Sequence, residues 1–222
     1  MERVSTERGL RYSADASGFV LLSEAAPEII LEIRYAGVEN FVGVRIDGYL
    51  EPAALLTREA AAALAAVSAD LAARGLRLKV FDAYRPRQAV AHFLRWAQDP
   101  ADTRMKAAYY PDLEKDALIP LGYIAEESAH SRGSAVDLTL CDDAGQELDM
   151  GGPFDRFGPI SRPDYPGITA GQRKNRLLLR EAMLARGFQP LAEEWWHFTL
   201  ENEPYPDTCF IFPVSRSVLD RA

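Results

Sequence analysis

Residues 128–140 read SAHSRGSAVDLTL, and the fold is best understood from this stretch outward. Polar and apolar residues alternate over residues 134–140, a pattern typical of a β-strand. Asp137 lies inside this strand, where a carboxylate is costly unless it is paired or bound to a metal. His130 precedes the strand, in a loop beside Gly133. We therefore expect a strand that presents a carboxylate, preceded by a loop that presents a histidine.

His130 and Asp137 are candidate ligands of a single metal ion. The chain can bring both side chains to one point if it folds back between them. Zinc in catalytic sites usually has three protein ligands drawn from His, Asp, Glu and Cys, together with a water. Each residue also has an ordinary interpretation. His130 could be a polar loop residue, and Asp137 could be a strand-end residue satisfied by backbone donors.

A second candidate cluster reads EWWH at residues 194–197. Glu194 and His197 are three residues apart and walled by two tryptophans, which suits a dry cleft around a metal ion. In such a cleft the acid transfers protons and the histidine binds the metal. The alternative is that the tryptophans are simply part of the core.

Few other residues can contribute to a metal site, because the chain has only three histidines and two cysteines. His92 lies on a predicted helix and is interpreted as a packed or partly exposed helix residue. Cys141 lies four residues beyond Asp137 and could bind a metal, but a buried thiol is the favoured interpretation.

The flanking sequence predicts the elements around these clusters. From their apolar and aromatic content we expect strands at residues 28–35, 76–84 and 194–200. From their composition and their glycine or proline ends we expect helices at residues 52–74, 86–98 and 172–186. Strands and helices do not alternate strictly, so we predict an α+β fold with a mainly antiparallel central sheet and flanking helices.

The composition of the 222-residue chain is that of a globular protein. Apolar residues make up 48% and charged residues 26%, which allows a substantial core and argues against general disorder. We predict a single domain over residues 1–222. The net charge of −8 argues against a nucleic-acid partner, because phosphate binding needs a basic face.

Two features bear on cellular location. Residues 1–22 contain no apolar run of signal-peptide length, and no stretch approaches the roughly 20 apolar residues of a membrane helix. Cys141 and Cys209 are too few for a disulfide framework and are expected to be reduced thiols. We therefore expect a cytoplasmic protein with no membrane contact.

The two clusters together resemble a known family. Residues 128–137 match S-x-H-x-x-G-x-A-x-D, and residues 194–197 match the E-W-W-H box, of the VanX-type D-alanyl-D-alanine dipeptidases. These enzymes belong to a wider zinc D,D-peptidase and hedgehog-like group. Further similar segments follow in the family's order: YA at 35–36, NFVG at 40–43, GY at 48–49, DAYRP at 82–86, MG at 150–151, FD at 154–155 and EPYP at 203–206.

The resemblance covers roughly residues 20–213, leaving short N- and C-terminal extensions, and implies a hedgehog/D,D-peptidase-like fold. It implies one zinc ion per chain, with His130, Asp137 and His197 as the ligands. It also implies that Glu194 is the general base that activates the attacking water and later protonates the leaving amine.

Four further residues match positions near the substrate in this family. Arg85 resembles the residue that stabilises the oxyanion, a role that a fixed guanidinium suits; the alternative is a salt bridge near a helix start. Ser128, Tyr35 and Asp155 match positions around the carboxylate and amine of the substrate. Ala83 replaces the family's usual glycine.

The function implied is hydrolysis of D-alanyl-D-alanine to free D-amino acids, with a small dipeptide as substrate. A peptidoglycan-trimming D,D- or L,D-carboxypeptidase or endopeptidase of the same group is one alternative. A non-catalytic, zinc-stabilised binding domain is another, which the presence of Glu194 and Arg85 disfavours. The loop at 156–169 and residues 214–222 depart from the family pattern and bear on substrate range. Oligomeric state is left open.

Overall fold

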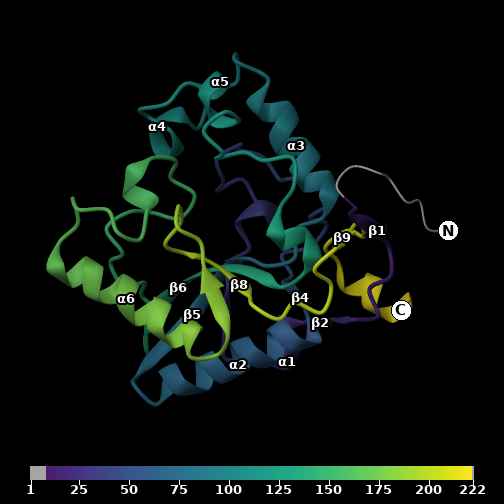
Figure 1. Cartoon of the computed structure of the whole chain (residues 1–222), viewed down its shortest axis with the longest axis vertical. Coiled ribbons are helices and arrows are strands. Elements are labelled where there is room, and N and C mark those ends of the chain that lie inside the picture. The colour runs from purple at the N-terminus through teal and green to yellow at the C-terminus, as the bar shows by residue number, and fades with distance from the viewer. Residues whose placement is uncertain (1–8, 222) are drawn as a thin grey trace.

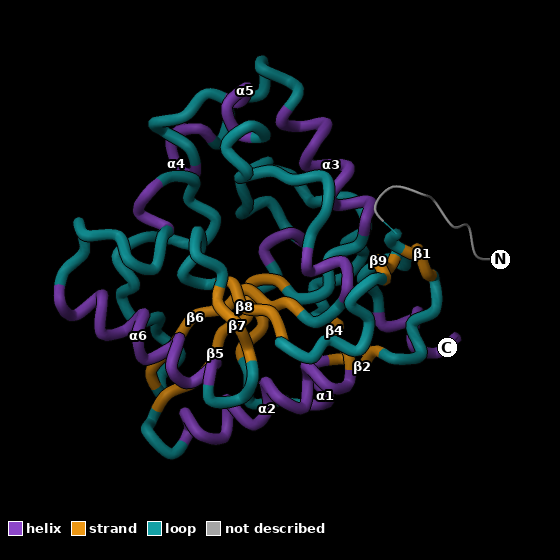
Figure 2. The backbone as a smooth tube through the Cα atoms, in the orientation of Figure 1, coloured by secondary structure: helices purple, strands orange, loops and turns teal. Residues whose placement is uncertain are grey.

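The computed structural model describes residues 9–221, and a five-stranded sheet lies at its centre (Figures 1 and 2). The strand order is β3-β5-β6-β8-β7, in which β3 and β5 are parallel and the other three pairs are antiparallel. The bounds are Ile30–Leu31 for β3, Leu76–Asp82 for β5, Ala135–Asp142 for β6, Phe188–Pro190 for β7 and His197–Leu200 for β8. The predicted α+β class with a mainly antiparallel sheet is confirmed.

Helices lie on both sides of this sheet (Figure 1). On one side are α1, α2 and α6, and on the other are α3, α4 and α5. Their bounds are Leu22–Ala25 for α1, Arg58–Ala72 for α2, Arg87–Ala97 for α3, Lys106–Tyr109 for α4, Lys115–Leu118 for α5 and Ala170–Leu184 for α6. The longer helices begin at polar caps: the Thr57 hydroxyl accepts from the Ala60 amide, and Thr169 and Gln172 form a capping box.

Two small sheets connect distant parts of the chain. β1 (Arg11–Ser13) pairs with β9 (Thr208–Phe210), which joins an early and a late segment of the chain, and β2 (Phe19–Leu21) pairs with β4 (Leu55–Thr57). Within residues 9–221, four 3₁₀ helices complete the elements: Arg34–Ala36, Ala129–Arg132, Pro159–Ser161 and Arg216–Arg221. Residues 1–8, part of the segment examined above for an export signal, and residue 222 lie outside the described residues.

Three predicted elements are shorter than their sequence patterns. The helix expected from residue 52 begins at Arg58, because the three preceding residues pair with β2 and Thr57 caps the helix. Only Ile30 and Leu31 of the strand expected at 28–35 pair with β5. The strand expected at 194–200 begins at His197, and residues 194–196 form a turn. In the first case residues 55–57 pair as a strand instead of joining the helix, and in the other two cases apolar residues are buried without the regular pairing that their pattern favours.

The register of the central strands decides where the polar residues meet. Asp82 at the end of β5 lies opposite Asp137 on β6, and Asp137 lies opposite His197 on β8. Three polar side chains from distant parts of the sequence therefore form one row across the sheet. Among residues 9–221, the helices are too short or too polar for any of them to cross a membrane.

Candidate metal centre and active site

The row across the sheet ends in a cluster of three potential ligand atoms. His130 Nε2 lies 3.1 Å from His197 Nδ1 and 3.2 Å from Asp137 Oδ1, and His197 Nδ1 lies 3.0 Å from the same carboxylate oxygen. All three residues are buried. Atoms bound about 2.0–2.2 Å from a tetrahedral zinc lie about 3.3 Å from one another, so the triangle has the right size for this ion.

The backbone and side-chain partners of the two histidines turn these atoms inward. His130 Nδ1 lies 2.7 Å from the carbonyl oxygen of Ala83. A carbonyl only accepts, so Nδ1 carries the proton and Nε2 presents its lone pair to the cluster. His197 Nε2 lies 3.2 Å from Thr199 Oγ1, which leaves Nδ1 facing the same point.

The donor set fits a cation. Two imidazole nitrogens and a carboxylate oxygen point at one another within hydrogen-bond distance. Burial alone would raise the pKa of Asp137, but the imidazoles of His130 and His197 lower that pKa below its ordinary value. Asp137 is thus a carboxylate, and two imidazoles with one carboxylate are a ligand set that catalytic zinc sites use. Three ligands also leave a fourth position open, unlike a closed structural site.

Glu194 stands beside this cluster without joining it. Its Oε2 lies 4.0 Å from His197 Nδ1, at the edge of ion-pair distance. Burial raises the pKa of Glu194 to about 7, and the nearby Asp137 carboxylate adds to the increase while His197 and Arg85 oppose it. A carboxyl group with a pKa near neutral can both accept and release a proton at physiological pH.

Arg85 also contacts the cluster. Its Nε donates to Asp82 Oδ2 at 2.9 Å, and its Nη2 lies 3.4 Å from Asp137 Oδ2. The guanidinium lies 5.0 Å from the ring centre of Tyr35 and 5.3 Å from that of Phe93. These contacts fix a permanent positive charge next to the metal cluster.

Asp82, which the sequence analysis did not single out as a site residue, contacts Arg85 beside the cluster. It is completely buried and accepts from Tyr49 Oη at 2.5 Å as well as from Arg85. Burial raises the pKa of Asp82, and Arg85 and His130 oppose the increase. The sequence signal that could have identified Asp82 is its position at the end of the strand LRLKVFD. A carboxylate buried there is costly unless it has partners.

Asp155 and Tyr35 form a hydrogen-bonded pair in the lining of the site. Tyr35 Oη donates to Asp155 Oδ2 at 2.8 Å, and both side chains are buried. Burial raises the pKa of Asp155 well above its ordinary value, and the Asp137 carboxylate adds to the increase. Among the described residues Asp155 is the one non-glycine residue with a positive φ, at 61°. Such strained positions are concentrated at functional sites.

A cavity of about 240 Å³ brings these groups together, apart from Asp82, which does not line it. All eight residues predicted from the sequence line it: Tyr35, Arg85, Ser128, His130, Asp137, Asp155, Glu194 and His197. Ser128 caps the turn that carries His130, accepting from the His130 amide at 3.3 Å. Tyr123, which the sequence analysis did not single out, also lines the cavity and stacks on Phe157 with ring centres 5.3 Å apart.

The residues left out of the predicted site lie elsewhere. His92 Nδ1 accepts from the Asp47 amide at 3.1 Å, away from the cluster. Cys141 is fully buried and is a free thiol, as expected.

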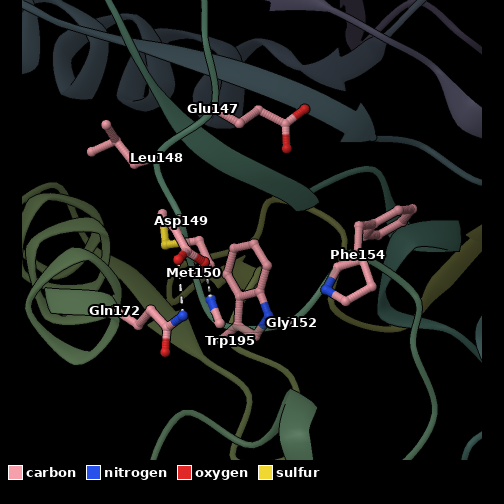
Figure 3. Close-up of a pocket in the computed structure, with 10 residues that line it drawn as sticks. Glu147, Leu148, Asp149, Met150, Gly152, Phe154, Gln172 and Trp195 are labelled. Atoms are coloured by element: carbon pink, nitrogen blue, oxygen red, sulfur yellow. Dashed lines mark hydrogen bonds between the residues drawn. The ribbon is translucent and has the colours of Figure 1, made fainter. Parts of the chain in front are cut away.

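A second hollow, of about 430 Å³, is lined by a different set of residues (Figure 3). Phe154 and Trp195 line this hollow, whereas their chain neighbours Asp155 and Glu194 line the active-site cavity. The two segments therefore form a partition between the hollows. Because the predicted site residues are absent from the lining of the second hollow, the chemistry belongs to the smaller cavity.

Comparison with known proteins agrees with this geometry. Residues 15–215 match the family model of the M15 peptidases, described as D-ala-D-ala dipeptidase. The D-alanyl-D-alanine dipeptidase of Enterococcus faecalis is 42% identical, covering 90% of this chain and 99% of that protein. Those of Streptomyces coelicolor and Escherichia coli are 41% and 35% identical, covering 89% and 92% of this chain and 98% and 99% of those proteins.

A solved structure, that of the vancomycin resistance D,D-pentapeptidase VanY, is a more distant match. It is 16% identical, with a TM-score of 0.41, covering 69% of this chain and 77% of that chain. The sequence matches are far stronger, because they extend over nearly the full length at 35–42% identity. This chain belongs to the M15 peptidase family of D-alanyl-D-alanine dipeptidases.

Proposed function

We propose that this protein is a zinc dipeptidase that hydrolyses D-alanyl-D-alanine and related D,D-dipeptides to free D-amino acids. The observation that carries the proposal is the triangle of His130, Asp137 and His197 with Glu194 beside it, in one small cavity. Membership of the dipeptidase family supports the substrate class.

The metal site is proposed to take one zinc ion on His130, Asp137 and His197. When bound, zinc polarises the scissile carbonyl and makes water more acidic. The protein contributes the orientation of its ligands, because the carbonyl of Ala83 and the hydroxyl of Thr199 hold the two imidazoles. We propose that the site lies in a single domain over the whole chain.

Glu194 is proposed to move the protons of the reaction. As a carboxylate it removes a proton from the attacking water, and as an acid it protonates the nitrogen of the leaving amino acid. Burial raises the pKa of Glu194 in the metal-free protein, and a bound cation opposes this increase, so Glu194 is proposed to be a carboxylate that can accept a proton when zinc is present.

Arg85 is proposed to stabilise the negative charge that develops on the carbonyl oxygen. The guanidinium is already in place before substrate arrives, since Asp82 holds Nε and two aromatic rings flank the plane. A pre-oriented charge of this kind needs little reorganisation during the reaction.

The rest of the cavity is proposed to recognise the two ends of a dipeptide. Asp155, with Tyr35 against one of its oxygens, pairs with the substrate ammonium. Ser128, at the start of the His130 turn, donates to the substrate carboxylate. The cavity, at about 240 Å³, is below the roughly 300–1,000 Å³ of sites for drug-sized ligands, which favours a very small substrate.

We propose that the protein acts in the cytoplasm. Cys141 and Cys209 are both buried free thiols, which is typical of a reducing compartment. The dipeptide is the one partner that the site itself supports.

A panel of D,D-, L,D-, D,L- and L,L-dipeptides, each with free or blocked termini, tests the proposal on the zinc-loaded protein. We expect turnover of D,D-dipeptides with a free amine, because a blocked amine would leave the buried Asp155 without its partner. Comparable turnover of N-acetylated D-Ala-D-Ala or of longer peptides would indicate a carboxypeptidase instead. Absence of turnover of every peptide, with zinc bound, would indicate a binding domain.

A further inference from the structure

The segment EPYP at residues 203–206 takes no part in the reaction described above, yet its first residue makes an unusually well-formed ion pair. Arg132 Nε lies 2.8 Å and 3.1 Å from the two oxygens of Glu203, and Nη2 lies 2.8 Å from Oε1. The Arg132 and Glu203 side chains are 24% and 12% exposed. Bidentate pairing of this kind fixes direction as well as distance.

Arg132 ends the 3₁₀ turn that carries His130. The turn is already held on one side, because the Arg85 amide donates to the His130 carbonyl and Ser131 Oγ donates to the Arg85 carbonyl. Gly133 follows with a φ of 81°, where a Cβ would collide with the Phe19 ring. The Arg132 side chain adds a contact between this turn and Glu203.

Glu203 lies just beyond β8, the strand that carries His197. Pro204 and Pro206 restrict the backbone on either side of Tyr205. The Tyr205 ring packs edge-on against Phe210 at 5.2 Å between ring centres, and its hydroxyl covers Gly18. These contacts hold the segment so that the Glu203 carboxylate has a defined position.

We infer that Arg132 and Glu203 are positioning residues for the metal centre, joining the turn that carries His130 to the segment that follows His197. This inference rests on the proposed function, in which both histidines bind one ion. The two ligands are 67 residues apart in the sequence, yet their facing nitrogens lie 3.1 Å apart. A fixed link between their supporting segments keeps that spacing before the metal binds.

The alternative is that the pair only stabilises the fold. The two roles differ in what they affect: a purely structural pair affects the stability of the metal-free protein, whereas a positioning pair affects zinc affinity. Changes in the groups that orient metal ligands typically weaken metal binding by about 10–100-fold. Zinc affinity and the melting temperature of the metal-free protein therefore separate the two roles.

Glu203→Gln is the test variant, since the amide keeps the shape but loses the charge. We expect its zinc affinity, measured by competition with a chelator, to fall by about 10–100-fold with little change in the apo melting temperature. Glu203→Asp keeps the charge but has a shorter side chain, so its zinc affinity should lie between those of the parent and Glu203→Gln. The double variant Arg132→Glu with Glu203→Arg should recover part of the lost affinity.

Asp70→Asn is the matched control. It breaks another bidentate pair, in which Arg186 Nε and Nη2 each lie 2.7 Å from an Asp70 oxygen, between α2 and the end of α6. Its zinc affinity should equal that of the parent. The inference is overturned if Glu203→Gln and Glu203→Asp bind zinc as tightly as the parent, or if the control weakens binding equally. A parent protein that binds no zinc would overturn the proposed function first.

Discussion

Arg85 reaches the metal cluster with its guanidinium held from behind by Asp82, whose other oxygen accepts from Tyr49. The orientation of the Arg85 guanidinium, which is proposed to stabilise the oxyanion, therefore depends on Asp82, a residue that does not itself line the cavity. The buried carboxylate is tolerated because both of its oxygens have donors.

Asp82→Asn should therefore reduce kcat much more than it raises KM, because a misdirected Arg85 stabilises the transition state less but binds the ground state almost as before. Loss of a supporting contact of this kind is expected to cost about 10–100-fold. Steady-state kinetics on D-Ala-D-Ala measure both parameters. Tyr49→Phe removes only the second donor and should have a smaller effect, and an unchanged kcat in Asp82→Asn would show that Arg85 does not depend on Asp82.

Helix α3, which follows directly after Arg85, is held at its C-terminus by a buried lysine on α5. Lys115 Nζ donates to the carbonyls of Trp96 and Asp99, each at 2.8 Å, and lies 4.0 Å from the Trp96 ring centre. Burial lowers the pKa of Lys115. The Trp96 carbonyl also accepts from the Asp99 amide, so the lysine adds a charged donor at the helix C-terminus, where a cation complements the helix dipole.

Lys115→Met should lower the free energy of unfolding by about 1–3 kcal/mol, because two carbonyls lose a charged donor. Chemical denaturation of the purified variants measures this change. Lys106→Met is the matched control, since Lys106 pairs with a Glu114 side chain that is 79% exposed, and such pairs contribute about 0–1 kcal/mol. Equal stability of the two variants would contradict the capping role of Lys115.

Across the whole molecule, the local motifs could be predicted from the sequence, but the strand register and the long-range contacts that bring them together could not. The spacing around His130 and Asp137 indicated a loop and a strand with a shared metal, and the structure brings their ligand atoms together with that of His197. The residue patterns contained no information on strand register, which places Asp82 opposite Asp137. The Tyr49–Asp82 contact joins residues 33 positions apart, so no local periodicity could reveal it.

The predicted strand at 28–35 was too long because, here too, the residue pattern does not determine the backbone pairing. Ile29 and Ile33 are buried outside the regular pairing, and only the segment between them bonds to β5, including the Glu32 amide, which donates to the Val80 carbonyl. Apolar content predicted the burial of this segment correctly, but burial does not determine which backbone groups pair.

The central claim, that the zinc cluster is catalytic and Glu194 is its base, is tested most directly by Glu194→Gln. The amide is close in size to the carboxylate and Glu194 is not a proposed ligand, so folding and zinc content should equal those of the parent. An amide cannot accept the proton of water, so turnover should fall by about 10²–10⁴-fold or more. Zinc content and D-alanine release are measured on the same sample. Full zinc with nearly abolished release is the expected result, and full zinc with parental release would contradict the claim.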